Sequence, residues 1–392
     1  MIAPLSHPHH TFTPMKIIFP LFALLFLLQS CPPDPRLAAR AESTDAYIGT
    51  YTRDEGWVNG KADGIYQVDV NPKSGVMSNK RLVKELTNPS FVKEGRGGRY
   101  LYAISELART DEPAGALYVF DVADDLREIA RLPTDSKAAC HVALDRSEEF
   151  IMTTNYLGGV AKLFRQTGDE VMEVDEFRVS KGLVPGKEPH LHSTTVSPSN
   201  RVVAIADLGL DRVWLFTLDR KNGKLIPHDQ PFVKLADGAG PRHTTWSADG
   251  RFLYVMNELN STVNVLDYSL LDDRFTIAQT ITTLPAGYTE KNSTADIHLS
   301  PDGRFLYGSN RGHNSIVMYA VDQATGKLTF LGHHPTEGDF PRNFAVAPTG
   351  KFVYVANQNT GNISVHKRNE KSGLLTFTGQ SFPVPTPVCI EF

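Results

Sequence analysis

SPDGRFLYGSN, residues 300–310, is the stretch of sequence that decides the fold, because it returns as SADGRFLYVMN at 247–257 and APTGKFVYVAN at 347–357. In each copy a polar turn leads into a short apolar run, the pattern of a β-strand that follows a tight turn. Weaker copies lead into three further strands, at 100–105, 150–155 and 202–207. The copies recur about every 46–53 residues, which is the period of a propeller blade.

Each repeat contains more than the turn and its strand. A short run precedes each turn and often opens with proline; across the chain these runs begin at or near Pro89, Cys140, His192, Pro241, Ala295, Pro341 and Pro387. A third apolar segment follows, as at 213–218, 262–267 and 315–321, and a fourth comes after a glycine turn such as 325–327. Four short strands per unit predict an all-β fold, a β-propeller of four-stranded blades.

The two ends of the chain complement each other. The last unit supplies only a first strand, 387–392, while the N-terminal segment supplies the other three, at 47–52, 64–70 and 75–78. Joined, they form one composite blade, and the pairing removes open sheet edges. With six complete units this predicts a seven-bladed propeller over residues 42–392, closed by the C-terminal strand. An open array of sheets would leave the complementary ends unexplained.

The N-terminus reads as an export leader. Lys16 precedes the apolar run 17–28, which is too short for an ordinary membrane span. Two processing routes fit: the lipobox-like sequence 28–31 would leave a lipid anchor on Cys31, and 39–41 resembles a simple cleavage site. We therefore expect residues 1–41 to be a signal peptide or lipoprotein leader with a short linker. The mature protein would be periplasmic or secreted, with no transmembrane span.

Composition narrows the functional classes. The net charge is −4 and no basic stripe is present, so we expect no nucleic-acid partner. Cys140 and Cys389 fall in blades that are not adjacent, which argues against a disulfide. No CxxC, HExxH or EF-hand spacing occurs, so we expect no metal and no cofactor. A metal site built from scattered Glu, Asn and Asp side chains stays open as an alternative. We expect a monomer that acts on a small molecule.

A site is expected where the repeats stop repeating. The position after the strand-ending Asn or its equivalent holds Glu106, Tyr156, Leu208, Glu258, Arg311 and Gln358. The position aligned with Arg242 holds Ser90, Cys140, His192, Ala295, Arg342 and Val388. The next position holds Phe91, His141, Ser193, His243, Asp296, Asn343 and Cys389. Because first strands line a propeller channel, we expect these rows near one mouth of it.

These rows gather arginine, histidine and carboxylate. Arginine forks bind carboxylate or phosphate, and a nearby His or Glu can act as a general base. The candidate catalytic residues are Glu258, His192 and Arg242, and the candidate substrate-binding residues are Arg311, Arg342, His190, His243, His141 and Asp207. Each has a structural alternative: the arginines could bond loop carbonyls, Glu258 could be an ion-pair partner, the histidines could line the wall, and Asp207 could cap a turn.

The motifs in combination resemble a known family. They are 47–52 (YIGTYT), 64–66 (GIY), 88–90 (NPS), 190–193 (HLHS), 207–212 (DLGLDR), 240–243 (GPRH), 257–258 (NE), 309–311 (SNR) and 341–344 (PRNF). The chain resembles the seven-bladed lactonases, typified by the bacterial propeller-type 6-phosphogluconolactonase and the fungal carboxy-muconate cyclase. For the cyclase a His, two Arg and a Glu have been proposed as the site. The resemblance puts them at His192 or His190, Arg242, Glu258 and Arg311.

The resemblance implies lactone chemistry, most simply hydrolysis of 6-phospho-D-glucono-1,5-lactone in glucose metabolism. Arg242 with Arg342 or Arg311 would bind an anionic group and polarise the carbonyl, and Glu258 or His192 would activate water. An export leader also fits another lactone, because sugar-phosphate enzymes of the family are expected in the cytosol. Two alternatives remain open: an exported, non-catalytic binding propeller, and a lactone-forming enzyme of the muconate cycloisomerase type.

Overall fold

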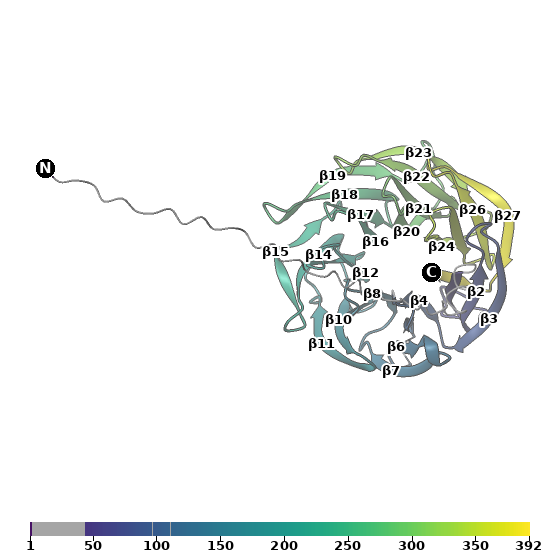
Figure 1. The fold of residues 1–392 in the computed structure, drawn as a ribbon, viewed down its shortest axis with the longest axis horizontal. Coiled ribbons are helices and arrows are strands. Elements are labelled where there is room, and N and C mark those ends of the chain that lie inside the picture. Colours follow the sequence, from purple (N-terminus) through teal and green to yellow (C-terminus); the bar gives the residue numbers. More distant parts are fainter. Residues whose placement is uncertain (2–43, 96, 110) are drawn as a thin grey trace. The chain divides into compact units, whose positions relative to one another are not determined.

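The computed structural model describes Met1 and residues 44–392 except 96 and 110. Within that part, seven four-stranded antiparallel sheets stand as blades around a central channel (Figure 1). This confirms the predicted seven-bladed propeller. The expected leader at 1–41 lies outside the described residues, apart from Met1.

The strands occupy equivalent places in the seven blades. The innermost are β4 (Pro89–Glu94), β8 (Ala139–Leu144), β12 (Leu191–Val196), β16 (Pro241–Trp246), β20 (Ser293–Leu299), β24 (Pro341–Val346) and β28 (Pro387–Glu391). The second are β5 (Tyr100–Ser105), β9 (Phe150–Asn155), β13 (Val202–Asp207), β17 (Phe252–Asn257), β21 (Phe305–Arg311), β25 (Phe352–Asn357) and β1 (Thr44–Thr50). The third are β6 (Ala116–Asp121), β10 (Val160–Thr167), β14 (Arg212–Asp219), β18 (Thr262–Ser269), β22 (Ser315–Val321), β26 (Asn362–Arg368) and β2 (Gly64–Val70). The outermost are β7 (Arg127–Pro133), β11 (Glu170–Arg178), β15 (Lys224–Lys234), β19 (Arg274–Thr282), β23 (Leu328–Pro335), β27 (Leu375–Pro383) and β3 (Met77–Glu85).

The composite blade closes the ring as predicted. Strand β28 pairs antiparallel with β1, so that Tyr47 faces Glu391 and Ile48 faces Ile390. The resulting sheet runs β28-β1-β2-β3 and mixes both ends of the described chain. Each inner strand therefore has an inner strand of a neighbouring blade on both sides, and the ring has no terminal blade.

The sequence repeated at 247–257, 300–310 and 347–357 holds its blade to the next one in each of these three copies. Its tyrosine donates a hydrogen bond to the carbonyl of a glycine in the following blade: Tyr254 to Gly326 at 3.1 Å, Tyr307 to Gly373 at 2.8 Å and Tyr354 to Gly75 at 3.0 Å. The phenylalanine of the repeated sequence packs on the same glycine, because an added Cβ would come within 2.2–2.5 Å of Phe252, Phe305 or Phe352. The glycines also have positive φ, between 67° and 75°.

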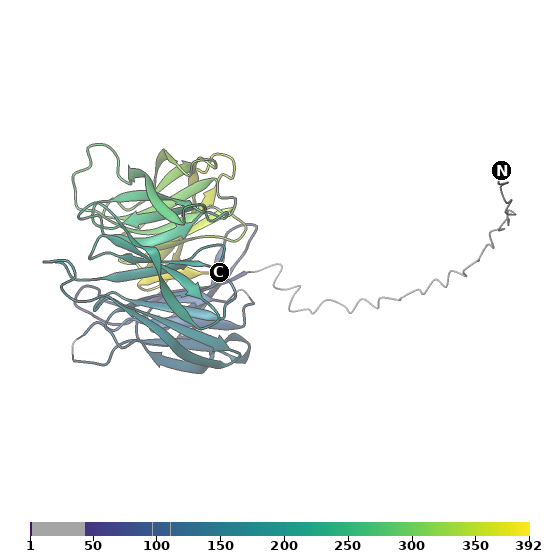
Figure 2. The same cartoon turned by 90° about the vertical axis from the view of Figure 1, so that its left-hand side faces the viewer.

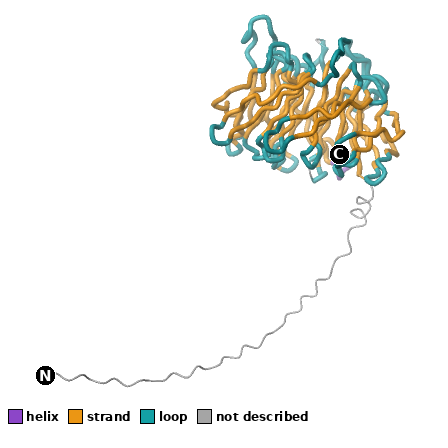
Figure 3. The backbone as a smooth tube through the Cα atoms, turned by 90° about the horizontal axis from the view of Figure 1, so that it is seen from above, coloured by secondary structure: helices purple, strands orange, loops and turns teal. Residues whose placement is uncertain are grey.

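The core lies between blades and not inside one sheet. The second strand is completely buried in β9, β13, β17, β21 and β25, and in β5 after its first residue, because both of its faces meet a neighbouring blade. Such strands read as continuous apolar runs. Seen edge-on, the strands form the body and the loops gather at the two faces (Figures 2 and 3). One short 3₁₀ turn, η1 (Val122–Asp124), occurs in the described part, where no helix could span a membrane.

Candidate active site

A β-bulge recurs at one height in all seven inner strands. In β16, Pro241 pairs with Asn257 and His243 with Met256, which leaves Arg242 as the extra residue. The same bulge leaves out Ser90, Cys140, His192, Arg342 and Val388, and in β20 it leaves out both Ala295 and Asp296. A bulge re-aims the side chain of its extra residue. This geometry brings the row aligned with Arg242 to one rim of the channel.

The row that follows each second strand is held at the same rim. The amide of Glu258 donates to the carbonyl of Gly240 at 2.7 Å, just before the bulge of its blade. The equivalent amides of Glu106, Tyr156, Leu208 and Gln358 bond the carbonyls of Asn88, Ala138, His190 and Phe340. Gly240 has a φ of +66°, and a Cβ on it would meet Leu259 at 2.5 Å. Both the conformation and the contact with Leu259 therefore favour glycine there.

The two rows meet in a cavity of about 820 Å³ at the channel mouth. Of the sequence candidates, His192, Arg242, Glu258, Arg311 and Arg342 line it. The remaining lining residues are Glu55, Trp57, Glu106, Ala108, Arg109, Ala138, Cys140, Tyr156, Leu157, Leu259, Lys291, Asn292, Ser293, Phe340 and Gln358. Five cationic side chains and three carboxylates stand on this wall, so it favours an anionic ligand.

Glu258 ties two buried arginines together. Its Oε2 atom lies 3.0 Å from Arg242 Nε and 2.9 Å from Arg311 Nη2. Both guanidinium groups also donate to β20 carbonyls, Arg242 to Ala295 and Arg311 to Thr294. Burial raises the pKa of Glu258, but Arg311, Arg242 and Arg342 outweigh it, so the net pKa lies below its ordinary value. Glu258 is therefore a carboxylate at neutral pH.

Arg342 is held differently from the other two arginines. It donates from Nη2 to the Tyr51 hydroxyl at 3.0 Å, and that hydroxyl donates to Glu106 at 2.8 Å. Its guanidinium lies 5.4 Å from the ring centres of both Tyr51 and Trp57. Among the described residues Arg342 makes no ion pair, so its charge is available to a ligand in the cavity.

His192 is a neutral imidazole at the cavity wall. Burial, reinforced by the charge of Arg242, holds the pKa of His192 well below 6.5. Its Nδ1 atom is buried without a hydrogen-bond partner in the described part of the chain. The ring lies 5.9 Å from that of Tyr156 and 5.2 Å from that of His243. A free nitrogen on a neutral ring can bind the proton of a water molecule.

Two sequence candidates stand behind the cavity wall. His190 donates from Nδ1 to the Tyr156 carbonyl and stacks on the Tyr156 ring at 4.4 Å. Asp207 is fully buried and accepts bonds from the Trp214 indole and from the amides of His190 and Leu210. Neither residue lines the cavity. Asp207 positions the loop around His190, because its carboxylate oxygens are taken up by these donors.

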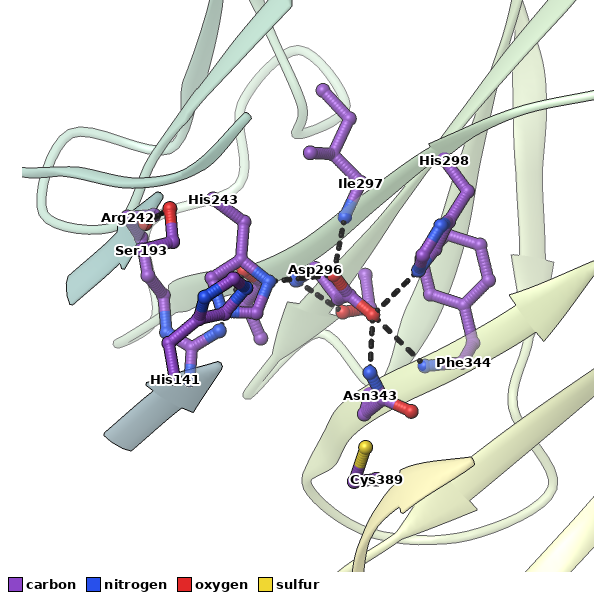
Figure 4. Close-up of polar contacts among 12 residues, drawn as sticks. His141, Ser193, Arg242, His243, Asp296, Ile297, His298, Asn343, Phe344 and Cys389 are labelled. Carbon is purple, nitrogen blue, oxygen red and sulfur yellow. Dashed lines mark hydrogen bonds and ion pairs between the residues drawn. The ribbon is translucent and has the colours of Figure 1, made fainter. Parts of the chain in front are cut away.

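His141 and His243 lie deeper in the channel, also outside the main cavity. His243 Nδ1 is 2.7 Å from Asp296 Oδ1, and His298 Nε2 is 2.8 Å from Oδ2 (Figure 4). The same carboxylate accepts from the Asn343 side chain at 2.6 Å. No group of three His, Cys, Asp or Glu side chains able to hold a metal ion is found among the residues described. Cys140 and Cys389 are free thiols, as expected.

Sequence reasoning missed several residues of the wall. Glu106 stands in the varying row but is not among the predicted site residues, although it is the only carboxylate of that row besides Glu258. Tyr51 follows β1 as Glu258 follows β17, and its amide bonds the Thr386 carbonyl, so the varying row extends to it. Trp57 lies in the loop beyond. Phe340 lies under Arg311, with its ring centre 5.1 Å from the guanidinium carbon, and has a φ of +64°. No signal in a single sequence marks such a contact.

Comparison with known proteins places the chain in a family. The family model "Lactonase, 7-bladed beta-propeller" matches residues 45–392. A 6-phosphogluconolactonase of Bacillus subtilis is 32% identical over 88% of this chain and 97% of its own length. Another, from Formosa agariphila, is 32% identical over 76% of this chain and 85% of its own length.

Solved structures agree. The periplasmic gluconolactonase PpgL of Pseudomonas aeruginosa superposes with a TM-score of 0.79 at 30% identity, over 88% of this chain and 98% of that one. A putative 6-phosphogluconolactonase from Bacteroides fragilis superposes with a TM-score of 0.79 at 30% identity, over 90% of this chain and 98% of that one. The chain belongs to the seven-bladed β-propeller lactonase family.

Proposed function

We propose that this protein is a lactone hydrolase of the 6-phosphogluconolactonase type, which opens an anionic sugar lactone to its acid. One observation carries the proposal: three arginines converge on a cavity of about 820 Å³ beside Glu258 and a neutral, partly unpartnered His192. The relatives named 6-phosphogluconolactonase support the same substrate class.

The arginines divide into two roles. Arg342 makes no ion pair among the described residues, so it binds the phosphate or carboxylate of the substrate. Arg311 keeps an unpartnered Nε–H, and Arg242 Nε lies at ion-pair distance from Glu258 without a hydrogen bond to it. These donors stabilise the oxyanion that forms when water attacks the lactone carbonyl. One such donor contributes on the order of 3 kcal/mol to transition-state stabilisation.

An imidazole is better suited than Glu258 to activate the water. Glu258 holds two guanidinium groups, and its lowered pKa makes it a weak proton acceptor. His192 is neutral and has a free Nδ1 atom at the cavity wall. General base catalysis of this kind accelerates a reaction by roughly 10²–10⁴-fold.

A substrate panel tests the proposal. The purified protein is assayed on 6-phosphogluconolactone, glucono-1,5-lactone and a muconolactone, with and without EDTA. We expect hydrolysis of the phosphorylated lactone, unchanged by EDTA. In Arg342→Gln its KM should rise at least tenfold, while the exposed Arg251→Gln should match the wild type. No hydrolysis of any lactone by folded protein would refute the function and favour a binding propeller, and net formation of a muconolactone would favour a cycloisomerase.

We also propose that the protein is exported to the periplasm or the medium. The support is the apolar run 17–28 behind Lys16. Cell fractionation should find the tagged protein outside the cytoplasm, and deletion of residues 1–28 should retain it inside. Cys31→Ala separates the two processing routes: it should abolish membrane attachment only if Cys31 carries a lipid anchor.

A further inference from the structure

A second, very small cavity lies in the channel beside the main one. Its volume of about 10 Å³ is close to that of a single water site. It shares Glu106, Cys140, His192, Arg242 and Arg342 with the main cavity. Its other lining residues are Tyr51, Ser90, Phe91, His243, Asn343 and Val388. The bulge row thus forms the common wall between a ligand-sized space and a water-sized one.

The two histidines that line this small cavity each have an unpartnered imidazole nitrogen. His243 Nε2 and His192 Nδ1 are both buried, and neither has a hydrogen-bond partner in the described part of the chain. The two rings are 5.2 Å apart, centre to centre. Buried polar atoms are almost always hydrogen-bonded, so two unpartnered nitrogen atoms on residues around one small cavity indicate a bound molecule with polar hydrogens.

The tautomer of His243 follows from its partner. Nδ1 lies 2.7 Å from Asp296 Oδ1, and a carboxylate can only accept, so Nδ1 carries the proton. Burial and Arg242 lower the pKa of His243 to about 4 against the opposing charge of Asp296, so the ring is neutral near pH 7. Its Nε2 atom therefore presents a lone pair, and the unpaired nitrogen is a proton acceptor.

Asp296 is fixed from several sides. Its oxygens accept from His298, from the Asn343 amide and from the backbone amides of Ile297 and Phe344 (Figure 4). Burial raises the pKa of Asp296, but His298 and His243 outweigh it and hold the pKa well below its ordinary value. A fixed carboxylate behind an imidazole orients the ring and stabilises the imidazolium that forms when the ring takes a proton.

We propose that the small cavity binds the attacking water and that His243, positioned by Asp296, is its general base. The proposal rests on the lactone hydrolase function proposed above. His192, the imidazole considered for this role above, is instead the second partner of the water, because no carboxylate among the described residues bonds its ring. A bound substrate anion offsets the charge of Arg242, which removes one of the influences that keep His243 neutral.

The proton balance is complete without a co-reactant. The water oxygen bonds to the lactone carbonyl carbon while one water proton passes to His243 Nε2. The tetrahedral oxyanion then collapses, the bond from that carbon to the ring oxygen breaks, and the ring oxygen takes the proton from Nε2 to become a hydroxyl. The new carboxylic acid loses its proton to solvent, and His243 returns to its neutral tautomer.

Site-directed variants test this role. The wild type is compared with His243→Gln and with His228→Gln, which removes a buried imidazole from another carboxylate. His228 lies 3.2 Å from Asp273 and lines neither cavity. We expect kcat to fall at least 100-fold in His243→Gln with KM within about threefold of wild type. His228→Gln should keep kcat within threefold.

The outcomes separate the two proposals. A wild type active on lactones with His243→Gln near wild-type kcat overturns the role of His243 and leaves the hydrolase function standing. A folded wild type inactive on every lactone refutes the function itself. Should His243→Gln fail to fold, a high-resolution crystal structure of the wild type decides. A water oxygen within hydrogen-bond distance of both His243 Nε2 and His192 Nδ1 supports the proposal, and an empty, dry cavity overturns it.

Discussion

At the scale of single residues, Glu258 balances charge that would otherwise be buried alone. In Glu258→Gln the guanidinium groups of Arg242 and Arg311 face each other without a carboxylate. We expect the free energy of unfolding to fall by about 3 kcal/mol, measured by urea denaturation at pH 7. Glu149→Gln is the matched control, because Glu149 joins Arg165 and Arg220 at the exposed surface. It should cost less than about 1 kcal/mol, and equal losses in the two variants would contradict this account.

His366 makes stability depend on pH. It is fully buried, Nε2 meets Ser364 and Nδ1 meets His334. Burial, then the charge of His334, lowers the pKa of His366 to about 3. Above its unfolded pKa of about 6.5 both states are neutral; below it only the unfolded state binds the proton, so stability falls as pH falls towards 3.

We expect His366 to lower the free energy of unfolding by about 2 kcal/mol as the pH falls from 6.5 to 4.5. The measurement is the urea midpoint at several pH values for the wild type and His366→Gln. The variant should lose less stability over this interval. If the urea midpoints of the two proteins fell in parallel from pH 6.5 to 4.5, His366 would not be the buried neutral group that makes stability depend on pH.

The cavity-lining residues that a single sequence can predict are those that differ from their counterparts in the other repeats. Arg242, Arg342 and His192 stand at one aligned position, and all three line the cavity. Asp207 and His190 stand in conspicuous motifs, yet the Asp207 carboxylate accepts bonds from neighbouring groups and His190 Nδ1 bonds the Tyr156 carbonyl. Hydrogen-bond partners come from other blades, so spacing along the chain does not reveal them.

At the scale of elements, the bulged inner strand builds the site. A regular strand sends neighbouring side chains to opposite faces, yet Arg242 and His243 both line the small channel cavity. The bulge between Pro241 and His243 reconciles these facts, since its extra residue shifts the alternation. The sequence predicted the strand from its alternation but gave no sign of the bulge, which depends on pairing with β17.

Gly240 is where this element can be tested. Its φ of +66° disfavours other residues, and a Cβ would meet Leu259 at 2.5 Å, next to Glu258. We expect Gly240→Ala to lose about 2–3 kcal/mol of stability, from backbone strain and overpacking, and to lower kcat through displacement of Glu258. Activity and urea denaturation are measured on the same preparations.

Gly238→Ala is the control that separates backbone strain from the contact of an added Cβ with Leu259. Gly238 has a φ of +77°, but nothing lies within 4 Å of the place that a Cβ would take there. It should lose only about 1–2 kcal/mol and keep wild-type kcat. Loss of activity in Gly238→Ala equal to that in Gly240→Ala would show that the backbone conformation, and not the contact with Leu259, sets the site.

At the scale of the whole molecule, closure was predictable because the two ends carry complementary parts of one blade. The packing that makes the ring continuous was not, because it joins residues far apart in the chain. Tyr354 donates to the carbonyl of Gly75 at 3.0 Å across 279 positions of sequence. The same contact joins Tyr307 to Gly373 inside the ring. The seam is therefore built like an ordinary junction between blades.

Because the two junctions are alike, we expect equal losses in the free energy of unfolding when either is disturbed: the one where the composite blade closes the ring, and one within the ring. A Cβ on Gly75 would meet Phe352 at 2.5 Å, and one on Gly373 would meet Phe305 at 2.2 Å, both at a φ of +75°. Gly75→Ala and Gly373→Ala should each lose about 2–3 kcal/mol and unfold in one urea transition. Gly379→Ala, with a φ of +83° and open space around it, should lose only about 1–2 kcal/mol. A separate early transition in Gly75→Ala alone would mean that the composite blade opens first and that the ring is weakest where its two ends meet.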